Sequence, residues 1–501
     1  MNADVIIIGS GFAGSVAAAR LVDAGFKVAL LERGPWRKTK PVEAAGINGA
    51  APLPLEGSKP GITIRSIRMA GGGPRQLTLN KRGLLEIHMA KGLRTIASSN
   101  VGGGSHIWGG VVSRPASPDY WDRINDRLSE DLLAPHFERV HRELGAMLPE
   151  NASEIPNHTS HAWKDVDYFE AVPESAQLPL ALLLPAKFGG PSPTHNRSPS
   201  TLDGRDGIFG SPSGAKASVD AIYLIPRLGN NLIINDLHEV KSIARISDSY
   251  EVGVRDHKQK IDKTFRARHV ILAAGTMNSV KLLCECEDSG GLSRMPALGL
   301  GFGTNGDCAG SWEPGDQRDA TLGTGALGRL VIKGQAKDDG FAIFMGGADR
   351  PPLPSWMPKF IANKINRAAG LKFQIIGMGA DKADGTLRFE NGRLKLNYSV
   401  TNSSVYEKIF TTFDLLSEQS GMPVKFNRND NFTCHPMGGC RISGSAQDGV
   451  VNSRGENHTN PGMYITDASV FPAPTGSPPS LNIAAWSSYV AEGLIKKLNE
   501  I

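Results

Sequence analysis

Residues 5–14 read Val-Ile-Ile-Ile-Gly-Ser-Gly-Phe-Ala-Gly, and this stretch decides the fold. Its first four residues are apolar, which is typical of a strand buried on both faces of a parallel sheet. The remainder has the form Gly-x-Gly-x-x-Gly, whose glycines permit a tight turn and a close approach of the backbone to a phosphate group. The stretch therefore predicts the first strand and turn of a dinucleotide-binding fold.

The residues that follow complete the expected strand–helix–strand unit. Residues 15–24 are rich in alanine, and Gly25 ends them as a glycine ends many helices. Residues 27–31 form a second strand that leads to Glu32, an acid at the distance from the glycines at which a ribose hydroxyl is bound. We therefore predict an adenine dinucleotide with its pyrophosphate at the helix N-terminus. The alternative is a glycine turn that only packs a helix on a strand, and Glu32 alone does not separate FAD from NAD.

Later segments extend the same sheet. Residues 100–110 contain five glycines, which suits backbone that approaches something flat or charged. Residues 267–275 and 462–466 read as further buried strands, and residues 479–498 read as a long helix with proline in its first turn. Because strands of one sheet occur near both ends of the chain, we predict a discontinuous dinucleotide domain with a second domain inserted.

Length and composition narrow the classes of function. The 501 residues exceed the usual span of one core and favour two domains. Basic residues outnumber acidic residues by only 55 to 50, with no long run of one sign, so no nucleic-acid partner is expected. Five cysteines form neither a disulfide framework nor the paired arms of a zinc site, so no metal is expected. The sequence shows neither a signal peptide nor an apolar run of about 18 residues, and we expect a cytoplasmic protein.

Several motifs together resemble the glucose-methanol-choline (GMC) family of flavoprotein oxidoreductases, and within it the cholesterol oxidase branch. The motifs lie in residues 9–14, 101–110, 273–275, 301–306, 435–440 and 464–467. The resemblance covers nearly the whole chain and implies FAD rather than NAD as the cofactor. It also implies oxidation of a CH–OH group by hydride transfer to flavin N5, with O2 or another electron acceptor. The expected substrate is a small-molecule alcohol that is bulky and largely apolar or ring-bearing.

Pattern and resemblance together predict an α/β fold, in which a discontinuous, doubly wound, Rossmann-like FAD-binding domain carries an inserted α+β substrate-binding domain. The FAD-binding domain is placed in residues 1–40, 85–114, 218–302 and 433–501. Residues 41–84 are expected to form a loop or lid region, and the substrate-binding domain is placed in residues 115–217 and 303–432. Within it, residues 386–396 alternate around Asn391-Gly392, which predicts a hairpin.

The resemblance also assigns residues to the cofactor. The pyrophosphate is expected at Gly9, Ser10, Gly11 and Gly14, the adenosine at Glu32 and Val240, and the ribityl chain and isoalloxazine at Gly102, Gly103, Gly104, Ser105, Trp108, Gly109, Gly110 and Asp467. Arg33, Ala274 and Gly275 are also expected to bind the cofactor. Pro479 begins the helix whose N-terminus points at the flavin pyrimidine ring in the family, where its positive dipole end stabilises negative charge. We expect FAD to be bound non-covalently, and the alternative is a covalent link through His106.

The chemistry is expected to rest on one histidine. Removal of a hydride from a carbinol carbon leaves a hydroxyl proton, which an imidazole can accept. His435 lies in the motif that carries the family's active-site histidine, and we predict this role for it. Pro478 stands where the family places a second asparagine or histidine, and Asn482, one helical turn later, is the candidate replacement. Residues 341–345 contain no acid to match the cholesterol oxidase glutamate, so sterol isomerisation is not expected, and Asp349 is interpreted as a solvated loop residue.

Two alternatives to alcohol oxidation stay open. The loss of the second proton-handling side chain fits a non-redox lyase, like the hydroxynitrile lyases of the family, in which FAD is a structural element. A flavoprotein that binds a partner without catalysis is the other alternative, and the complete motif around His435 weighs against it.

The segment from residue 350 to residue 373 is basic and amphipathic. It contains five basic residues and no acid. Its apolar residues near helical spacing include Trp356, Phe360, Ile361 and Ile365. Such a segment can make weak contact with an anionic membrane surface. The alternative is a surface helix that packs its apolar side on its own domain.

Overall fold

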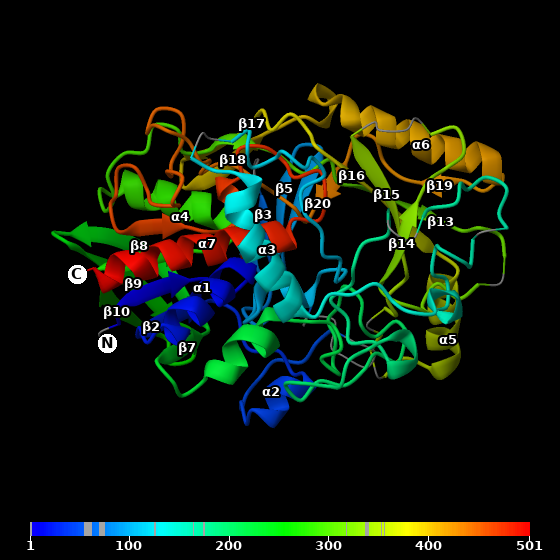
Figure 1. Ribbon diagram of the computed structural model, residues 1–501, viewed down its shortest axis with the longest axis horizontal. Helices are drawn as coiled ribbons and strands as arrows, with labels where there is room; N and C mark the ends of the chain where they lie inside the picture. The colour runs from blue at the N-terminus through cyan, green and yellow to red at the C-terminus, as the bar shows by residue number, and fades with distance from the viewer. Residues whose placement is uncertain are drawn as a thin grey trace.

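The structure is a computed structural model. It describes residues 3–54, 63–69, 76–124, 127–163, 165–173, 176–316, 318–335, 340–351, 353–354 and 356–500. Two regions lie side by side in Figure 1, and both ends of the chain lie in the region at the left. The region at the right holds an antiparallel sheet covered by a long helix.

The left-hand region is built around a five-stranded parallel sheet with the order β21-β11-β1-β2-β7. Its strands are β1 (Val5–Ile8), β2 (Val28–Glu32), β7 (Leu232–Asp236), β11 (His269–Leu272) and β21 (Met463–Ile465). All of β1 is buried, which accounts for its continuous apolar sequence. The pairing of β1 with β11 and of β11 with β21 confirms that distant segments assemble the dinucleotide fold.

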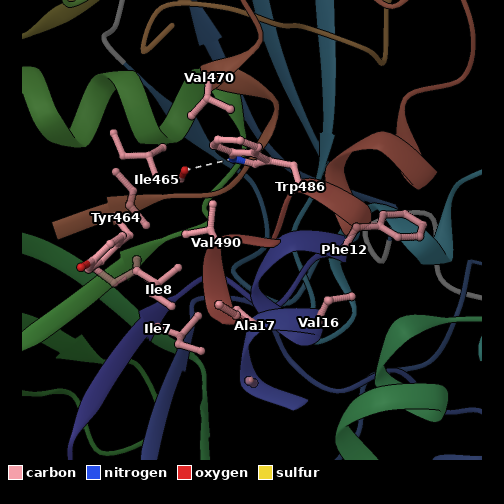
Figure 2. Close-up of a cluster of buried hydrophobic side chains, with 14 of the residues drawn as sticks. Ile7, Ile8, Phe12, Val16, Ala17, Tyr464, Ile465, Val470, Trp486 and Val490 are labelled. Carbon is pink, nitrogen blue, oxygen red and sulfur yellow. Dashed lines mark hydrogen bonds between the residues drawn. The ribbon is translucent and has the colours of Figure 1, made fainter. Parts of the chain in front are cut away.

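Helix packing brings the N-terminal and C-terminal parts of the chain together in this region. The helices are α1 (Phe12–Asp23), α3 (Glu130–Leu144), α4 (Thr276–Asp288) and α7 (Ser480–Asn499). Helix α7 packs on α1 and α3. Figure 2 shows Trp486 and Val490 of α7 in the core beside Ile465, and the indole N–H of Trp486 donates to the Ile465 carbonyl oxygen at 3.4 Å. The C-terminal helix is therefore fixed against the first helix and the last strand of the sheet.

Two smaller sheets complete the left-hand region. An antiparallel meander consists of β8 (His238–Ile246), β9 (Ser249–Asp256) and β10 (Ile261–Ala267). Strand β12 (Leu300–Phe302) pairs with β17 (Gly385–Glu390), which pairs with β18 (Arg393–Asn397). The turn between β17 and β18 lies at Asn391-Gly392, both with positive φ, and the predicted hairpin is confirmed.

A third sheet, with the order β20-β6-β5-β3-β4, crosses the domain limits expected from the sequence. Its strands are β3 (Ile64–Met69), β4 (Leu77–Thr78), β5 (Leu85–Ala90), β6 (Leu93–Ser98) and β20 (Asn431–Thr433). The predicted loop or lid region, residues 41–84, therefore contains two strands and the short helix α2 (Lys40–Ala44). Residues 55–62 and 70–75 of that region lie outside the described residues.

The right-hand region has its own core. Its antiparallel sheet has the order β14-β15-β16-β13-β19. The elements are β13 (Cys308–Trp312), β14 (Ala326–Leu330), β15 (Phe341–Gly346), α5 (Lys359–Gly370), β16 (Phe373–Gly379), α6 (Ser404–Ser420) and β19 (Val424–Lys425). The Trp163 ring packs edge-on against Phe373 and beside Trp312, which are buried in this core. A sheet covered by a helix is the α+β architecture expected for the inserted domain.

Candidate active site

A cavity opens at the carboxyl ends of the parallel strands, around the ends of β1, β2 and β11. The chain runs from β1 to its neighbour β2, while β11 and β21 lie on the opposite side of β1, so the cavity lies where the strand order reverses. Nucleotides bind at this position in open α/β sheets. The N-terminal residues of α1, α4 and α7 line the same cavity, and three positive helix ends suit an anionic ligand.

The cavity brings together most of the residues predicted to bind FAD. Those that line it are Gly9, Ser10, Gly11, Glu32, Arg33, Gly103, Gly104, Trp108, Val240, Ala274, Gly275, Asp467 and Pro479. Five others, Gly14, Gly102, Ser105, Gly109 and Gly110, are not among its lining residues. These five residues therefore lie beside or behind the residues that form the cavity wall.

Glycines make the cradle that a dinucleotide needs. Gly9 has a φ of +99°, and a Cβ on it would lie 2.3 Å from the carbonyl oxygen of Ala273. A Cβ on Gly14 would lie 1.9 Å from the carbonyl oxygen of Gly9, so the turn from β1 into α1 closes only with glycine at both positions. A Cβ on Gly104 would meet no atom within 4 Å among the described residues, so this backbone faces open space. The residues present therefore fit a bound FAD.

Lys216 holds the glycine-rich loop from behind. Its Nζ donates to the carbonyl oxygens of His106 at 3.1 Å and Trp108 at 2.9 Å, and to the Gly207 carbonyl. The side chain is buried, and burial lowers the pKa of Lys216 to about 8. Sequence reasoning missed this residue because a single lysine, more than a hundred positions from the loop, carries no local signal.

Asp349 is not the solvated residue that the sequence predicted. It is half-buried, and its Oδ2 accepts a hydrogen bond from the Ile208 N–H at 3.2 Å. Burial raises the pKa of Asp349 to about 6, although the nearby charge of Lys216 acts in the opposite direction. The loop after β15 therefore returns to the interior instead of facing water.

Glu32 lies at the end of β2, where the ribose of an adenosine is expected. One carboxylate oxygen accepts hydrogen bonds from the backbone N–H of Ser10 at 3.1 Å and its hydroxyl at 2.7 Å. The other accepts the Gly34 N–H at 2.8 Å. Burial raises the pKa of Glu32, and these hydrogen bonds oppose the shift. The acid thus fixes the glycine turn and keeps lone pairs for a ligand hydroxyl.

Arg33 belongs to a buried charge cluster beside this end of the cavity. Its guanidinium pairs with Glu86, and its Nη1 donates to Asn278 Oδ1 at 3.1 Å. Arg68 also pairs with Glu86, its Nε lying 2.6 Å from Oε1. Burial alone raises the pKa of Glu86, but Arg33 and Arg68 outweigh it, and the pKa is held well below its usual value. The cluster ties β2, β3, β5 and α4 together at the adenosine end.

Asp467 links the last strand to α4. Its Oδ2 accepts the Gly275 N–H at 2.9 Å and pairs with the Ser279 hydroxyl, while its Oδ1 accepts the Ser469 N–H at 3.0 Å. Burial raises the pKa of Asp467. The carboxylate therefore fixes the backbone of the cavity wall as well as lining it.

His435 follows strand β20 and lines the cavity. Its Nδ1 lies 2.9 Å from Oδ1 of Asp307, a residue that is buried and that precedes β13. Thr433 Oγ1 donates to the other Asp307 oxygen at 2.8 Å, and the His435 N–H donates to Thr433 Oγ1 at 2.9 Å. Burial lowers the pKa of His435, but the charge of Asp307 outweighs it, and the pKa is raised well above its usual value. The Asp307 carboxylate therefore binds Nδ1 of His435 and not Nε2.

Cys434 stands next to this pair, with Sγ 3.7 Å from His435 Nε2 and 4.0 Å from Asp307 Oδ2. One ligand atom from each of the three side chains lies within 4.8 Å of the others, which is a spacing that a metal ion could use. The sequence predicted no metal, and the proton-transfer role argued below requires none.

Asp307 is, after Lys216, a second residue of the candidate site that the sequence analysis missed. It directly follows the motif at residues 301–306, which was used for the resemblance but not for chemistry. The only sequence signal for this residue was an acid that directly follows a glycine, Gly306. Its partner lies 128 positions along the chain, and nothing local connects the two.

The structure does not bring Asn482 to the cavity. Asn482 is buried on α7, and its Nδ2 donates to the Ser113 carbonyl oxygen at 3.3 Å. The cavity is lined at this helix by Pro479, Ser480 and Ile483 instead. Asn482 therefore lies outside the cavity, with its amide on the Ser113 carbonyl, and its catalytic role stays a prediction.

His106 is turned away from the cavity. Its Nε2 lies 3.2 Å from Asp220 Oδ1, and both side chains are buried. His106 does not line the cavity, whereas Gly103, Gly104 and Ile107 around it do. Burial raises the pKa of Asp220, but the charge of His106 outweighs it and lowers the pKa overall.

Comparison with known proteins adds to this geometry. Residues 409–487 match the GMC oxidoreductase family, and residues 7–35 match the NAD(P)-binding Rossmann-like domain. A cholesterol oxidase of Mycobacterium tuberculosis is 23% identical over 97% of this chain and 90% of its own length. The chain is therefore similar to GMC oxidoreductases in its C-terminal segment, and to a cholesterol oxidase along nearly its whole length. The predicted resemblance to this family is thereby confirmed, and GMC oxidoreductases are flavin-dependent proteins.

Other GMC relatives agree. A cholesterol oxidase of Acinetobacter baumannii is 24% identical over 96% of this chain and 92% of its own length. A long-chain-alcohol oxidase of Arabidopsis thaliana is 22% identical over 99% of this chain and 67% of its own length. The crystal structure of pyridoxine 4-oxidase from Mesorbium loti has a TM-score of 0.60 and 16% identity, covering 98% of this chain and 99% of that one. The chain therefore shares the fold of that oxidase along nearly its whole length.

Among the described residues, no helix combines the length and the apolar character needed to span a bilayer.

Proposed function

We propose that this GMC protein is an FAD-dependent oxidoreductase that oxidises the CH–OH group of a small-molecule alcohol, with His435 as the proton acceptor. One observation carries the proposal: a histidine on the wall of the nucleotide cavity is aligned by a buried carboxylate through Nδ1 and keeps Nε2 for another partner. This is the arrangement expected of an oriented general base.

The residues of the chain account for the proton. Nδ1–H of His435 donates to Asp307, which selects the tautomer with an unprotonated Nε2. When Nε2 takes the hydroxyl proton, the imidazolium that forms is stabilised by the same carboxylate. FAD, when bound, supplies the two-electron oxidation by accepting a hydride from the carbinol carbon. The helix N-termini of α1, α4 and α7 supply positive potential around it.

The substrate class is proposed as a bulky, largely apolar or ring-bearing alcohol. Apolar side chains of the cavity wall, including Phe12, Ile96 and Trp108, support this class. Strand β15 carries no acid, so no side chain of that strand is available for double-bond isomerisation.

An anaerobic screen of alcohols tests the function. A substrate is expected to remove the absorbance of the oxidised flavin when O2 is absent, and admission of O2 or an artificial acceptor restores it. If turnover of a substrate leaves the flavin oxidised throughout, the protein acts as a lyase and the oxidoreductase proposal is wrong.

We also propose that FAD is bound non-covalently, because His106 is paired with buried Asp220 rather than exposed to the cavity. Acid precipitation of the holoprotein should then release all yellow colour into the supernatant. Colour retained in the pellet of the wild type and lost from a His106→Ala pellet would establish a covalent link instead.

A further inference from the structure

Helix α5 carries a local excess of positive charge. Residues 350–373 contain Arg350, Lys359, Lys364, Arg367 and Lys372 and no acid. The whole chain has 55 basic and 50 acidic residues, a net charge of +5. The charge of this one segment is also +5, so basic and acidic residues are equal in number in the rest of the chain. Lys372 lies 3.6 Å from Glu313, but Lys359, Lys364 and Arg367 form no ion pair with any acid that the structure describes.

The apolar side of α5 is not packed on its own domain. Trp356 is 79% exposed and Phe360 is 75% exposed. Ile361 and Ile365, one turn apart, are also exposed, and Gly370 is the only buried residue of the helix. Water-exposed aromatic and aliphatic side chains at one place mark a surface that binds something. The structure thus disagrees with the alternative of a helix packed on its own domain.

Phe360, Ile361 and Ile365 share the short helix α5 with the unpaired basic residues, and Trp356 lies three residues before the helix begins. Such a helix lies in the plane of a membrane interface, where its apolar side enters the acyl boundary and its basic side chains meet anionic headgroups. An apolar protein partner would bury Trp356 and Phe360, but it would offer no negative charge to Lys359, Lys364 and Arg367. Figure 1 places α5 at the lower edge of the right-hand region.

We propose that Trp356 and helix α5 form a docking surface for an anionic lipid bilayer, and that the protein binds such a surface peripherally. This inference goes beyond the proposed alcohol oxidation and does not depend on it. The binding has two components, the insertion of Trp356 and Phe360 and the attraction of the basic residues to anionic headgroups.

Vesicle sedimentation of the holoprotein tests the proposal. The protein should pellet with phosphatidylcholine vesicles that contain phosphatidylserine and remain in solution with phosphatidylcholine alone. The double variant Trp356→Ser/Phe360→Ser should lose at least about ten-fold in partition coefficient. The variant Lys364→Glu/Arg367→Glu should lose about five-fold or more per residue, and about 0.5 M salt should weaken wild-type binding because it screens the charges.

Matched controls separate docking from general stickiness and from misfolding. Ile246 and Ile261 are 50% and 47% exposed on the β8–β10 sheet, at the opposite end of the molecule in Figure 1. The variant Ile246→Ser/Ile261→Ser should bind vesicles as the wild type does. All variants should keep the flavin spectrum, since none of these residues lines the FAD cavity.

Three results would overturn the proposal. The first is a wild type that does not bind anionic vesicles at low salt, and the second is an α5 variant that binds them as tightly as the wild type. The third is concentration-dependent dimerisation in sedimentation velocity without lipid that the Trp356→Ser/Phe360→Ser variant abolishes, because a second copy of the chain would then cover the helix. None of these results bears on alcohol oxidation, which is measured without vesicles.

Discussion

His435 accepts a proton only when Nε2 carries none, and its neighbour works against that state. Burial lowers the pKa of His435, but the carboxylate of Asp307 raises it by more, so the imidazolium persists to higher pH than in free histidine. The same carboxylate makes Nε2 a stronger base once the proton has left. Activity should therefore rise with pH as His435 deprotonates.

Asp307→Asn tests this coupling. The variant should lower the pKa of His435, so the rising limb of the kcat/KM profile should move to lower pH. The maximal rate should fall, but by less than the roughly 100- to 10,000-fold contribution of a general base, because Nε2 remains. Asp119→Asn, at an exposed position, is the control. A limb that stays at the wild-type pH would show that Asp307 does not set the protonation of His435.

His435→Ala removes the base itself. Turnover should fall by about 100- to 10,000-fold, while the flavin content and spectrum remain those of the wild type. Rapid-reaction measurement of flavin reduction with excess alcohol gives the rate of the affected step. The exposed His161→Ala is the matched control, and a His435→Ala enzyme with wild-type reduction would remove His435 from the mechanism.

At the scale of elements, the glycine-rich loop depends on a side chain from another segment. Gly103 and Gly104 have no side chains with which to anchor themselves, and the loop instead offers carbonyl oxygens to the buried ammonium of Lys216. Hydrogen bonds from Lys216 thus hold a loop whose glycines have no side chains that could pack.

Lys216→Met keeps most of the apolar stem and removes the donors. Each buried carbonyl left without a partner costs about 1–3 kcal/mol, and the loop should move. FAD affinity should fall by about ten-fold or more, measured by titration of the apoprotein with FAD. Lys187→Met, at an exposed lysine, should leave the affinity unchanged. Equal affinities in the two variants would show that the loop holds its shape without Lys216.

At the scale of the molecule, the cavity joins residues from the first, middle and last parts of the chain. A ligand that binds only this assembled state stabilises it by mass action, by about 2.7 kcal/mol at a free concentration one hundred times its Kd. Removal of FAD should therefore lower the Tm, and added FAD should restore it in a concentration-dependent manner. A Tm indifferent to FAD would mean that the assembled cavity does not hold the cofactor.

The parts of this architecture that local patterns encode could be predicted from the sequence. The strand Val5–Ile8 and the glycine turn after it are an example, because burial on both faces and the needs of a tight turn each leave a direct mark. Strands β3 and β4 were not predicted because β3 is held by its pairing with the later strand β5, β4 is held by its pairing with β3, and their own sequences are only partly apolar.

The candidate site divides in the same way. His435 could be found from its motif, whereas Asp307 and Lys216 could not, since each acts on atoms more than a hundred positions away. The exposure of Trp356 and Phe360 was equally invisible, because an amphipathic pattern does not say whether the domain covers the apolar side.

The place of β21 has a consequence for biosynthesis. Residues 463–465 form an outer strand of the sheet that begins with residues 5–8, and α7 closes the core only after them. The nascent chain must therefore leave the ribosome almost entirely before the nucleotide fold can close, and its early strands wait with unpaired edges. This topology therefore places the capture of FAD after synthesis of the C-terminal strand and helix.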